Sequence, residues 1–190
     1  MVDPFNITNY NLTESELQEV LIFWICVAGK TASLIARSVD RLLNSLEGST
    51  PFEKIRRVGY KDLPQKLKSC GIGCQTIKAK SLWELVNSDI DLRTCSIDEL
   101  ESIFGIGRKT SRCFVMHSRR NAQCAGLDTH ILKFLRSKGH DVPKSTPGSK
   151  KKYLEIENLF LKYAKKSNKT IAKFDLDIWK KYAYNGGKSI

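Results

Sequence analysis

A capping box followed by a long apolar stretch at helical spacing most constrains the fold of this chain. In the box Thr13-Glu14-Ser15-Glu16, the Thr13 hydroxyl and the Glu16 carboxylate are placed to satisfy free N–H groups where a helix begins. Apolar residues then cover one side of the predicted helix and most of the other, at Leu17, Val20, Leu21, Ile22, Phe23, Trp24, Ile25, Cys26 and Ala28. Because a helix that is apolar all round must be buried, the sequence predicts a central helix that ends near Gly29.

The same spacing recurs along the rest of the chain. A second capping box, Ser96-Ile97-Asp98-Glu99, predicts a helix that ends at Phe104, and Asp128 is expected to cap a helix through Arg136. Apolar periodicity predicts further helices over residues 34–46, 52–58, 63–69, 76–86, 108–118, 153–163 and 171–179. No segment has the pattern of a β-hairpin, so the sequence predicts an all-α fold.

Composition and charge indicate the class of partner. The 190 residues are 41% hydrophobic and 27% charged, which is typical of a globular protein with one core or two small lobes. The formal net charge is +12, from 32 Lys and Arg against 20 Asp and Glu. Such an excess favours a polyanion such as nucleic acid, although a basic surface that only aids solubility has the same composition.

The cysteines and the longest apolar stretch bear on the cellular compartment. No secretory signal precedes the six cysteines, and a chain of this length does not need disulfides, so we expect reduced thiols. The longest uncharged apolar stretch, residues 20–28, is about half of what a membrane span requires. We therefore expect an intracellular protein that does not enter a membrane.

Two predicted helices are joined by Phe104-Gly105-Ile106-Gly107. Glycines allow a sharp turn and bring free N–H groups close to a ligand, and the start of the second helix adds roughly half a positive charge. Gly105, Gly107 and Arg108 are therefore candidate contacts to a DNA phosphate, without any reading of base sequence. A plain corner between helices is the alternative interpretation.

Lys109 lies in the first turn after this hairpin. The helix dipole and the neighbouring Arg108 and Arg112 disfavour its ammonium form, and a neutral amine is the form that attacks carbon. Lys109 is thus a candidate nucleophile, and phosphate binding is its simpler role.

These residues resemble a known family. Phe104-Gly105-Ile106-Gly107-Arg108-Lys109-Thr110 followed by Leu127-Asp128-Thr129-His130 is similar to the helix-hairpin-helix DNA glycosylases of the endonuclease III superfamily. The resemblance implies two helical lobes with a DNA-binding cleft between them: one lobe over residues 13–121, with the hairpin at about 96–118, and the other from residues 1–12 and 122–190. It also implies that Lys109 attacks the sugar carbon that bore a damaged base and that Asp128 completes the site. The expected partner is double-stranded DNA that contains a damaged base, and the expected pathway is base excision repair.

Cys113 suggests which base is removed. It lies one helical turn beyond Lys109 on the same face, where 8-oxoguanine DNA glycosylases carry a similar cysteine. Residues 152–157 and 174–179 also resemble the C-terminal part of archaeal 8-oxoguanine glycosylases. A small buried cysteine is the alternative for Cys113. Three functions remain open: an 8-oxoguanine glycosylase with abasic-site lyase activity, an endonuclease III-like enzyme for oxidised pyrimidines, and a non-catalytic DNA-binding module.

Other candidate residues and cofactors follow from the resemblance. His130 and Trp179 are candidates for the base pocket, with Tyr182 as a second stacking residue, and Lys30 is the candidate wedge for the gap left by a flipped base, beside Gly29. The alternatives are that His130 orients Asp128 or a phosphate or only packs, that the two aromatic residues belong to the core, and that Lys30 is a solvated loop lysine. No cysteine lies beyond Cys124, where many relatives carry a four-cysteine loop, so we expect no iron–sulfur cluster. We expect no metal site and no cofactor, and a monomeric protein.

Overall fold

The computed structural model describes residues 1–184, with side chains for residues 1–183. Within this part of the chain all regular structure is helical and no strand is present. The helices are α1 (Glu14–Val27), α2 (Ala32–Asn44), α3 (Pro51–Val58), α4 (Leu63–Ser69), α5 (Gln75–Val86), α6 (Ile97–Ser102), α7 (Arg108–Ser118), α8 (Thr129–Ser137), α9 (Lys150–Lys166) and α10 (Ile171–Tyr184). The predicted all-α class is confirmed.

The local signals for helix starts are confirmed by hydrogen bonds. Thr13 Oγ1 accepts from the N–H of Glu16, and the Glu16 carboxylate accepts from the N–H of Thr13, so both halves of the capping box are present. Ser96 and Glu99 make the same pair of bonds at the start of α6. These caps place the first residues of two helices from short-range sequence alone.

The predicted end of the helix after Ser96 is wrong. The helix after Ser96 ends at Ser102 rather than at Phe104, because Ile103 takes an extended conformation. Two residues later, Gly105 has a φ of 80°, which is in the left-handed region that favours glycine. The sharp turn of the hairpin therefore begins earlier than apolar spacing indicated.

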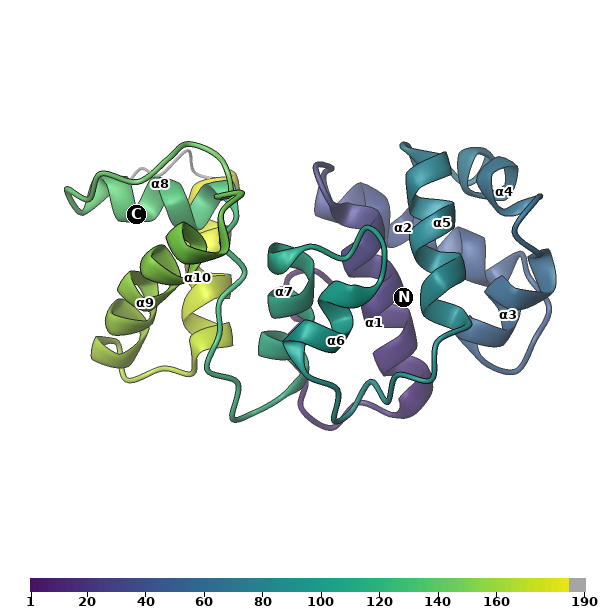
Figure 1. Ribbon diagram of the computed structural model, residues 1–190, viewed down its shortest axis with the longest axis horizontal. Helices are drawn as coiled ribbons and strands as arrows, with labels where there is room; N and C mark the ends of the chain where they lie inside the picture. The colour runs from purple at the N-terminus through teal and green to yellow at the C-terminus, as the bar shows by residue number, and fades with distance from the viewer. Residues whose placement is uncertain (185–190) are drawn as a thin grey trace.

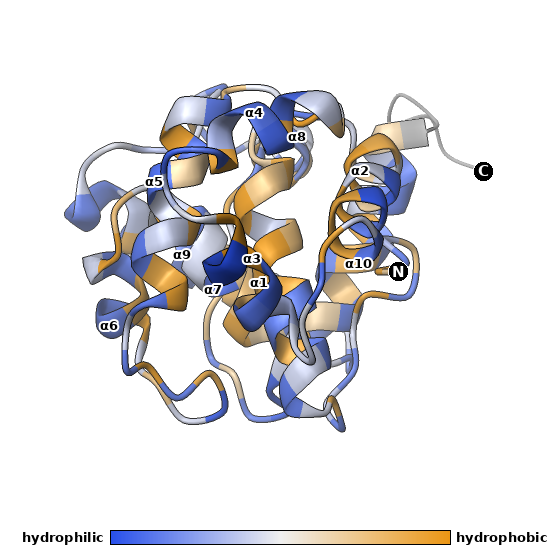
Figure 2. Cartoon of the chain, turned by 90° about the vertical axis from the view of Figure 1, so that its right-hand side faces the viewer, coloured by the Kyte–Doolittle hydropathy of each residue, from blue (hydrophilic) through white to orange (hydrophobic). Residues whose placement is uncertain are grey.

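Helix α1 is central, as its sequence predicts. Leu21, Ile22, Phe23 and Cys26 are at most 1% exposed, and α1 packs against α2, α3, α5 and α7. Figure 2 shows hydrophobic residues along α1 in the middle of the molecule, while hydrophilic residues lie on the outer helix faces. Burial of large apolar side chains on every side of one helix holds the N-terminal helices together.

Figure 1 shows α8, α9 and α10 as one group and α1 to α7 as another, with an extended segment that leads from α7 to α8. Residues 1–12 contact both groups: the Phe5 ring lies 5.6 Å from that of Trp179 in α10, and Asn9 N donates to the carbonyl of His117 in α7 at 3.0 Å. The division into lobes at residues 13 and 121 stays a proposal. What matters for the site is that α7, α8 and α10 come together, and α10 contacts both of the others.

The state of the cysteines and the length of the helices bear on disulfides and on membrane insertion. All six cysteines are free in the structure, and five of them are buried. In residues 1–184, no helix has the length and apolar character needed to cross a membrane.

Candidate active site

The hairpin between α6 and α7 has one anchored side and one open side. Ile106 is 3% exposed and packs into the core, and a Cβ on Gly105 would lie 3.0 Å from the Cβ of Ser81. Gly107 is the N-cap residue of α7, and a Cβ there would meet no atom within 4 Å. The turn therefore leaves open space in front of the N-terminus of α7, where an anion can approach free N–H groups.

The two arginines near the start of α7, Arg108 and Arg112, have different partners. Arg108 donates to the carbonyl of Gly148 at 2.7 Å and so ties the hairpin to the loop before α9. Arg112 is buried and paired with Glu101 and Glu157. Because two carboxylates balance its charge, Arg112 does not act on Lys109 as the unpaired cation that the sequence suggested.

A cavity of about 850 Å³ lies between α1, α7, α8 and α10. Six of the residues expected at the site line it: Lys30, Lys109, Cys113, Asp128, His130 and Trp179. Gly105, Gly107 and Arg108 do not line it. Helix α7 therefore presents two features at its N-terminus, the open glycine turn outside the cavity and Lys109 inside it.

Asp128 is the N-cap residue of α8, as the sequence predicts. Its Oδ1 accepts from the N–H of His130 at 2.8 Å and from that of Ile131 at 2.9 Å. The second oxygen, Oδ2, makes no hydrogen bond within the described residues. Since Oδ1 takes both cap bonds, Asp128 is held in place by one oxygen and keeps the other available to a ligand in the cavity.

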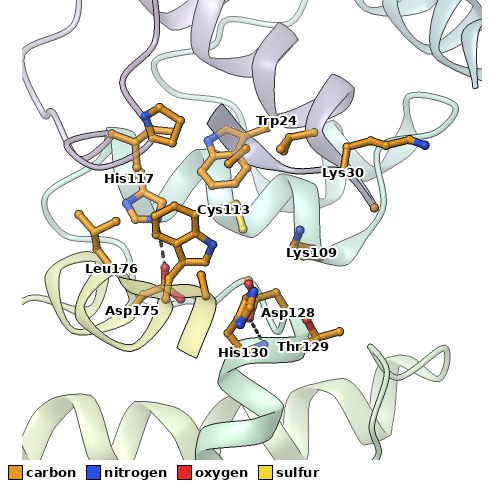
Figure 3. A pocket seen from close by; sticks show the side chains of 18 of the residues that line it. Trp24, Lys30, Lys109, Cys113, His117, Asp128, Thr129, His130, Asp175 and Leu176 are labelled. Carbon is orange, nitrogen blue, oxygen red and sulfur yellow. Dashed lines mark hydrogen bonds and ion pairs between the residues drawn. The ribbon is translucent and has the colours of Figure 1, made fainter. Parts of the chain in front are cut away.

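Lys109 and Asp128 come from different helices and meet at the same cavity. Figure 3 shows Lys109 on α7 and, next to it in the cavity lining, Asp128 and His130 at the start of α8. An amine and a carboxylate on facing walls can act on the same atom of a bound ligand, the amine as nucleophile and the carboxylate on positive charge.

Cys113 forms part of the cavity wall, one turn beyond Lys109 as expected. Its side chain is buried, and burial raises the pKa of the thiol well above its usual range, so the sulfur stays protonated. Gly126, in the segment before α8, packs directly against this sulfur. The thiol therefore shapes the cavity and is not a reactive thiolate.

Trp24, His117 and Asp175 are among the cavity residues that were not predicted. His117 Nε2 lies 3.3 Å from Asp175 Oδ2, its Nδ1 lies 2.7 Å from Thr8 Oγ1, and its ring stacks on Trp24. Burial raises the pKa of the Asp175 carboxyl, while the hydrogen bond from His117 acts in the opposite direction. The sequence held one usable signal: Asp175 lies four residues before Trp179 and so shares its helix face.

The two candidate stacking residues and the candidate wedge differ in where they lie relative to the cavity. Trp179 lines the cavity and packs edge-on against Phe5. Tyr182 lies outside the cavity, with its hydroxyl 2.8 Å from Ser137 Oγ, so it is not a second stacking residue there. Lys30 is exposed at the cavity's edge, and Figure 3 shows its side chain extending away from Asp128. Its amine lies 3.5 Å from where a Cβ on Gly73 would be.

Comparisons with known proteins all identify 8-oxoguanine DNA glycosylases as similar to this chain. Residues 1–169 match a family model described as 8-oxoguanine DNA glycosylase. The 8-oxoguanine DNA glycosylase/AP lyase of Picrophilus torridus is 34% identical over 130 residues, which are 67% of this chain and 58% of that protein. The corresponding protein of Thermotoga maritima is 31% identical over 130 residues, 67% of this chain and 59% of that protein. The matched region thus spans less than two thirds of these relatives.

Solved structures have the same fold. The crystal structure of the Thermotoga maritima 8-oxoguanine DNA glycosylase superposes with a TM-score of 0.74 at 23% identity, over 97% of this chain and 86% of that one. The Methanocaldococcus jannaschii 8-oxoguanine glycosylase/lyase, in complex with 15mer DNA containing 8-oxoguanine, gives a TM-score of 0.69 at 25% identity, over 93% and 84% of the two chains. The arrangement of helices around the cavity is therefore one that other proteins share.

Proposed function

The chain belongs to the 8-oxoguanine DNA glycosylase family, and we propose that it removes 8-oxoguanine from double-stranded DNA and then nicks the strand at the abasic site. The observation that carries the proposal is the placement of Lys109 and Asp128 on facing walls of one cavity. The curated relatives named above are glycosylase/AP lyases, which supports the same pair of activities.

The chemistry follows from the two residue types. The flipped-out nucleotide loses its base as the bond between C1′ and the base breaks, and the base leaves with the bonding electrons and takes up a proton. The carboxylate of Asp128 stabilises the positive charge that develops on the sugar. The amine of Lys109 then bonds to C1′ and loses a proton, and the sugar ring opens as the C1′–O4′ bond breaks and O4′ takes up a proton. The resulting protonated Schiff base acidifies the proton on C2′. Loss of that proton expels the 3′ phosphate and breaks the strand.

The rest of the molecule supplies the grip on DNA. The open glycine turn at Gly105 and Gly107 binds one phosphate, and the net charge of +12 attracts the duplex. Cys113, His130 and Trp179 bound the space for the extruded base, and Lys30 fills the gap in the duplex. We propose that the protein acts as a monomer on DNA inside the cell, without a cofactor.

Two other functions are weighed against this one. An oxidised pyrimidine needs the same Lys109 and Asp128, but the family match and Cys113 favour the oxidised purine. A non-catalytic DNA-binding module needs only the hairpin. Such a function does not explain why a lysine and a carboxylate line the same cavity.

A lesion panel with borohydride trapping tests the proposal. Duplexes that carry one 8-oxoguanine opposite each of the four bases, one oxidised pyrimidine or one abasic site are incubated with the protein, with and without borohydride. We expect cleavage and a covalent adduct with 8-oxoguanine duplexes, and no adduct from Lys109→Gln. Lys162→Gln, which removes an exposed lysine of α9, is the matched control and keeps both activities. No cleavage of any 8-oxoguanine duplex would refute the substrate, and an adduct that persists in Lys109→Gln would refute the nucleophile.

A further inference from the structure

The segment that leads from α7 to α8 is irregular yet buried. Residues 124–127 are all buried and belong to no helix, and Asp128 follows directly. Buried backbone N–H and carbonyl groups without partners cost free energy, so a buried irregular segment depends on side chains from elsewhere for its hydrogen bonds.

Two side chains of α9 supply these bonds. The Tyr153 hydroxyl donates to the carbonyl of Ala125 and accepts from the N–H of Leu127, both at 2.9 Å. The carboxylate of Glu157 accepts from the N–H of Ala125 at 2.8 Å. The two residues are four positions apart and therefore share one helix face, and both are at most 5% exposed. Their bonds flank Gly126, the residue that packs against Cys113.

The same two side chains also hold α7. Arg112 Nε donates to Glu157 at 2.9 Å, and the Arg112 guanidinium lies over the Tyr153 ring, 4.8 Å from its centre. Arg112 is three residues after Lys109 on α7. One patch of α9 thus contacts the helix that carries Lys109 and the segment that leads into Asp128.

We propose that Tyr153 and Glu157 are positioning residues that set the separation of Lys109 from Asp128. This inference rests on the proposed function. Neither residue lines the cavity, so neither touches the substrate, and they act through the backbone of residues 125–127. Shifts of about 1 Å in a catalytic group are enough to lower a reaction rate by about 100-fold.

Tyr153→Phe is the sharpest variant, since it keeps the ring and its contact with Arg112 and removes every hydroxyl bond, including a longer one of 3.5 Å to the carbonyl of Arg108. Tyr163→Phe is the matched control: it lies on the same helix and loses one hydrogen bond, to His140 Nε2, away from the cavity. The base-excision rate constant is measured in single turnovers on an 8-oxoguanine duplex with excess protein, together with the Kd for that duplex.

We expect Tyr153→Phe to lower the rate constant at least tenfold while the Kd stays within twofold, and Tyr163→Phe to leave both within twofold. A role in overall stability alone would lower the reacting fraction and leave the rate constant unchanged. An unchanged rate constant in folded Tyr153→Phe would overturn the inference.

Hydrogen exchange at the Leu127 amide gives a readout that does not depend on activity. We expect exchange at least tenfold faster in Tyr153→Phe than in the wild type, and unchanged exchange in Tyr163→Phe. Wild-type exchange in Tyr153→Phe would refute the positioning role. If the wild type excises no base, the proposed function fails, and the exchange result alone decides whether α9 holds the segment.

Glu157→Gln carries the test if Tyr153→Phe does not fold. The amide oxygen of Gln still accepts from the N–H of Ala125, but the side chain no longer carries the charge that pairs with Arg112. We therefore expect a loss in rate that is smaller, two- to tenfold. A wild-type rate together with wild-type exchange would overturn the inference.

Discussion

Gly126 lies so close to Cys113 that a Cβ on the glycine would overlap the cysteine sulfur. The same Cβ would lie 3.1 Å from the backbone carbonyl oxygen of Lys109. The backbone before Asp128 is therefore packed directly against the helix turn that carries Lys109. No bulkier residue at position 126 leaves the two walls of the cavity at their present separation.

Gly126→Ala is expected to slow base excision by about 100-fold, because the added methyl group must push the segment and α7 apart. The double variant Cys113→Ala/Gly126→Ala removes the sulfur but leaves the Lys109 carbonyl, so it should recover part of the rate. Single-turnover excision by the four proteins, including Cys113→Ala alone, measures this coupling. A Gly126→Ala protein with the wild-type rate would contradict the close packing.

Asp128→Asn is expected to lower excision by about 100- to 1,000-fold, because the amide cannot stabilise developing positive charge. Asn is as good an N-cap residue as Asp, so the thermal midpoint should stay nearly unchanged. The Kd for lesion DNA should also stay within about threefold, since the carboxylate acts on the transition state. Equal losses of rate and affinity would show that Asp128 mainly binds DNA.

Alanine substitutions at the two hairpin glycines are expected to have different effects, one on stability and the other on DNA binding. Gly105→Ala strains a φ of 80° and crowds Ser81, so it should destabilise the fold by about 1–3 kcal/mol. Gly107 has a φ of −91° and open space, so Gly107→Ala should fold normally but weaken binding of undamaged duplex. Thermal melts and fluorescence anisotropy separate the two effects. Unchanged duplex affinity in Gly107→Ala would argue against a phosphate at this turn.

The Asp175 carboxyl, whose side chain is 14% exposed, should make stability depend on pH. Its pKa is raised in the folded protein by burial, with Asp128 acting in the same direction and His117 and Lys109 acting against it. The folded state therefore holds this proton to a higher pH than the unfolded chain does, and stability is lost as the pH rises through the raised value. Asp175→Asn has no such proton, so its thermal midpoint relative to the wild type should be more favourable at pH 7.5 than at pH 4. A difference between the two proteins that does not change with pH would contradict this.

The sequence predicted the features that depend on neighbouring residues. The caps at Thr13, Ser96 and Asp128 involve residues three apart or fewer, and the buried α1 follows from its own apolar faces. The Gly105 turn and the placement of Lys109 just beyond it are equally local. Such signals act over one helical turn, so they can be read without knowledge of the fold.

The remaining features involve residues far apart in the sequence. His117 meets Asp175, Arg112 is paired with Glu157 rather than left as a cation beside Lys109, and Tyr182 turns to Ser137 instead of the cavity. No local pattern encodes such contacts, because each depends on how α7, α8, α9 and α10 pack. The sequence by itself determined an all-α chain with a lysine after a glycine turn and an aspartate at a helix start. Only the tertiary structure decided that both face one cavity, because their approach depends on the packing of Gly126 on Cys113 and on the bonds from α9.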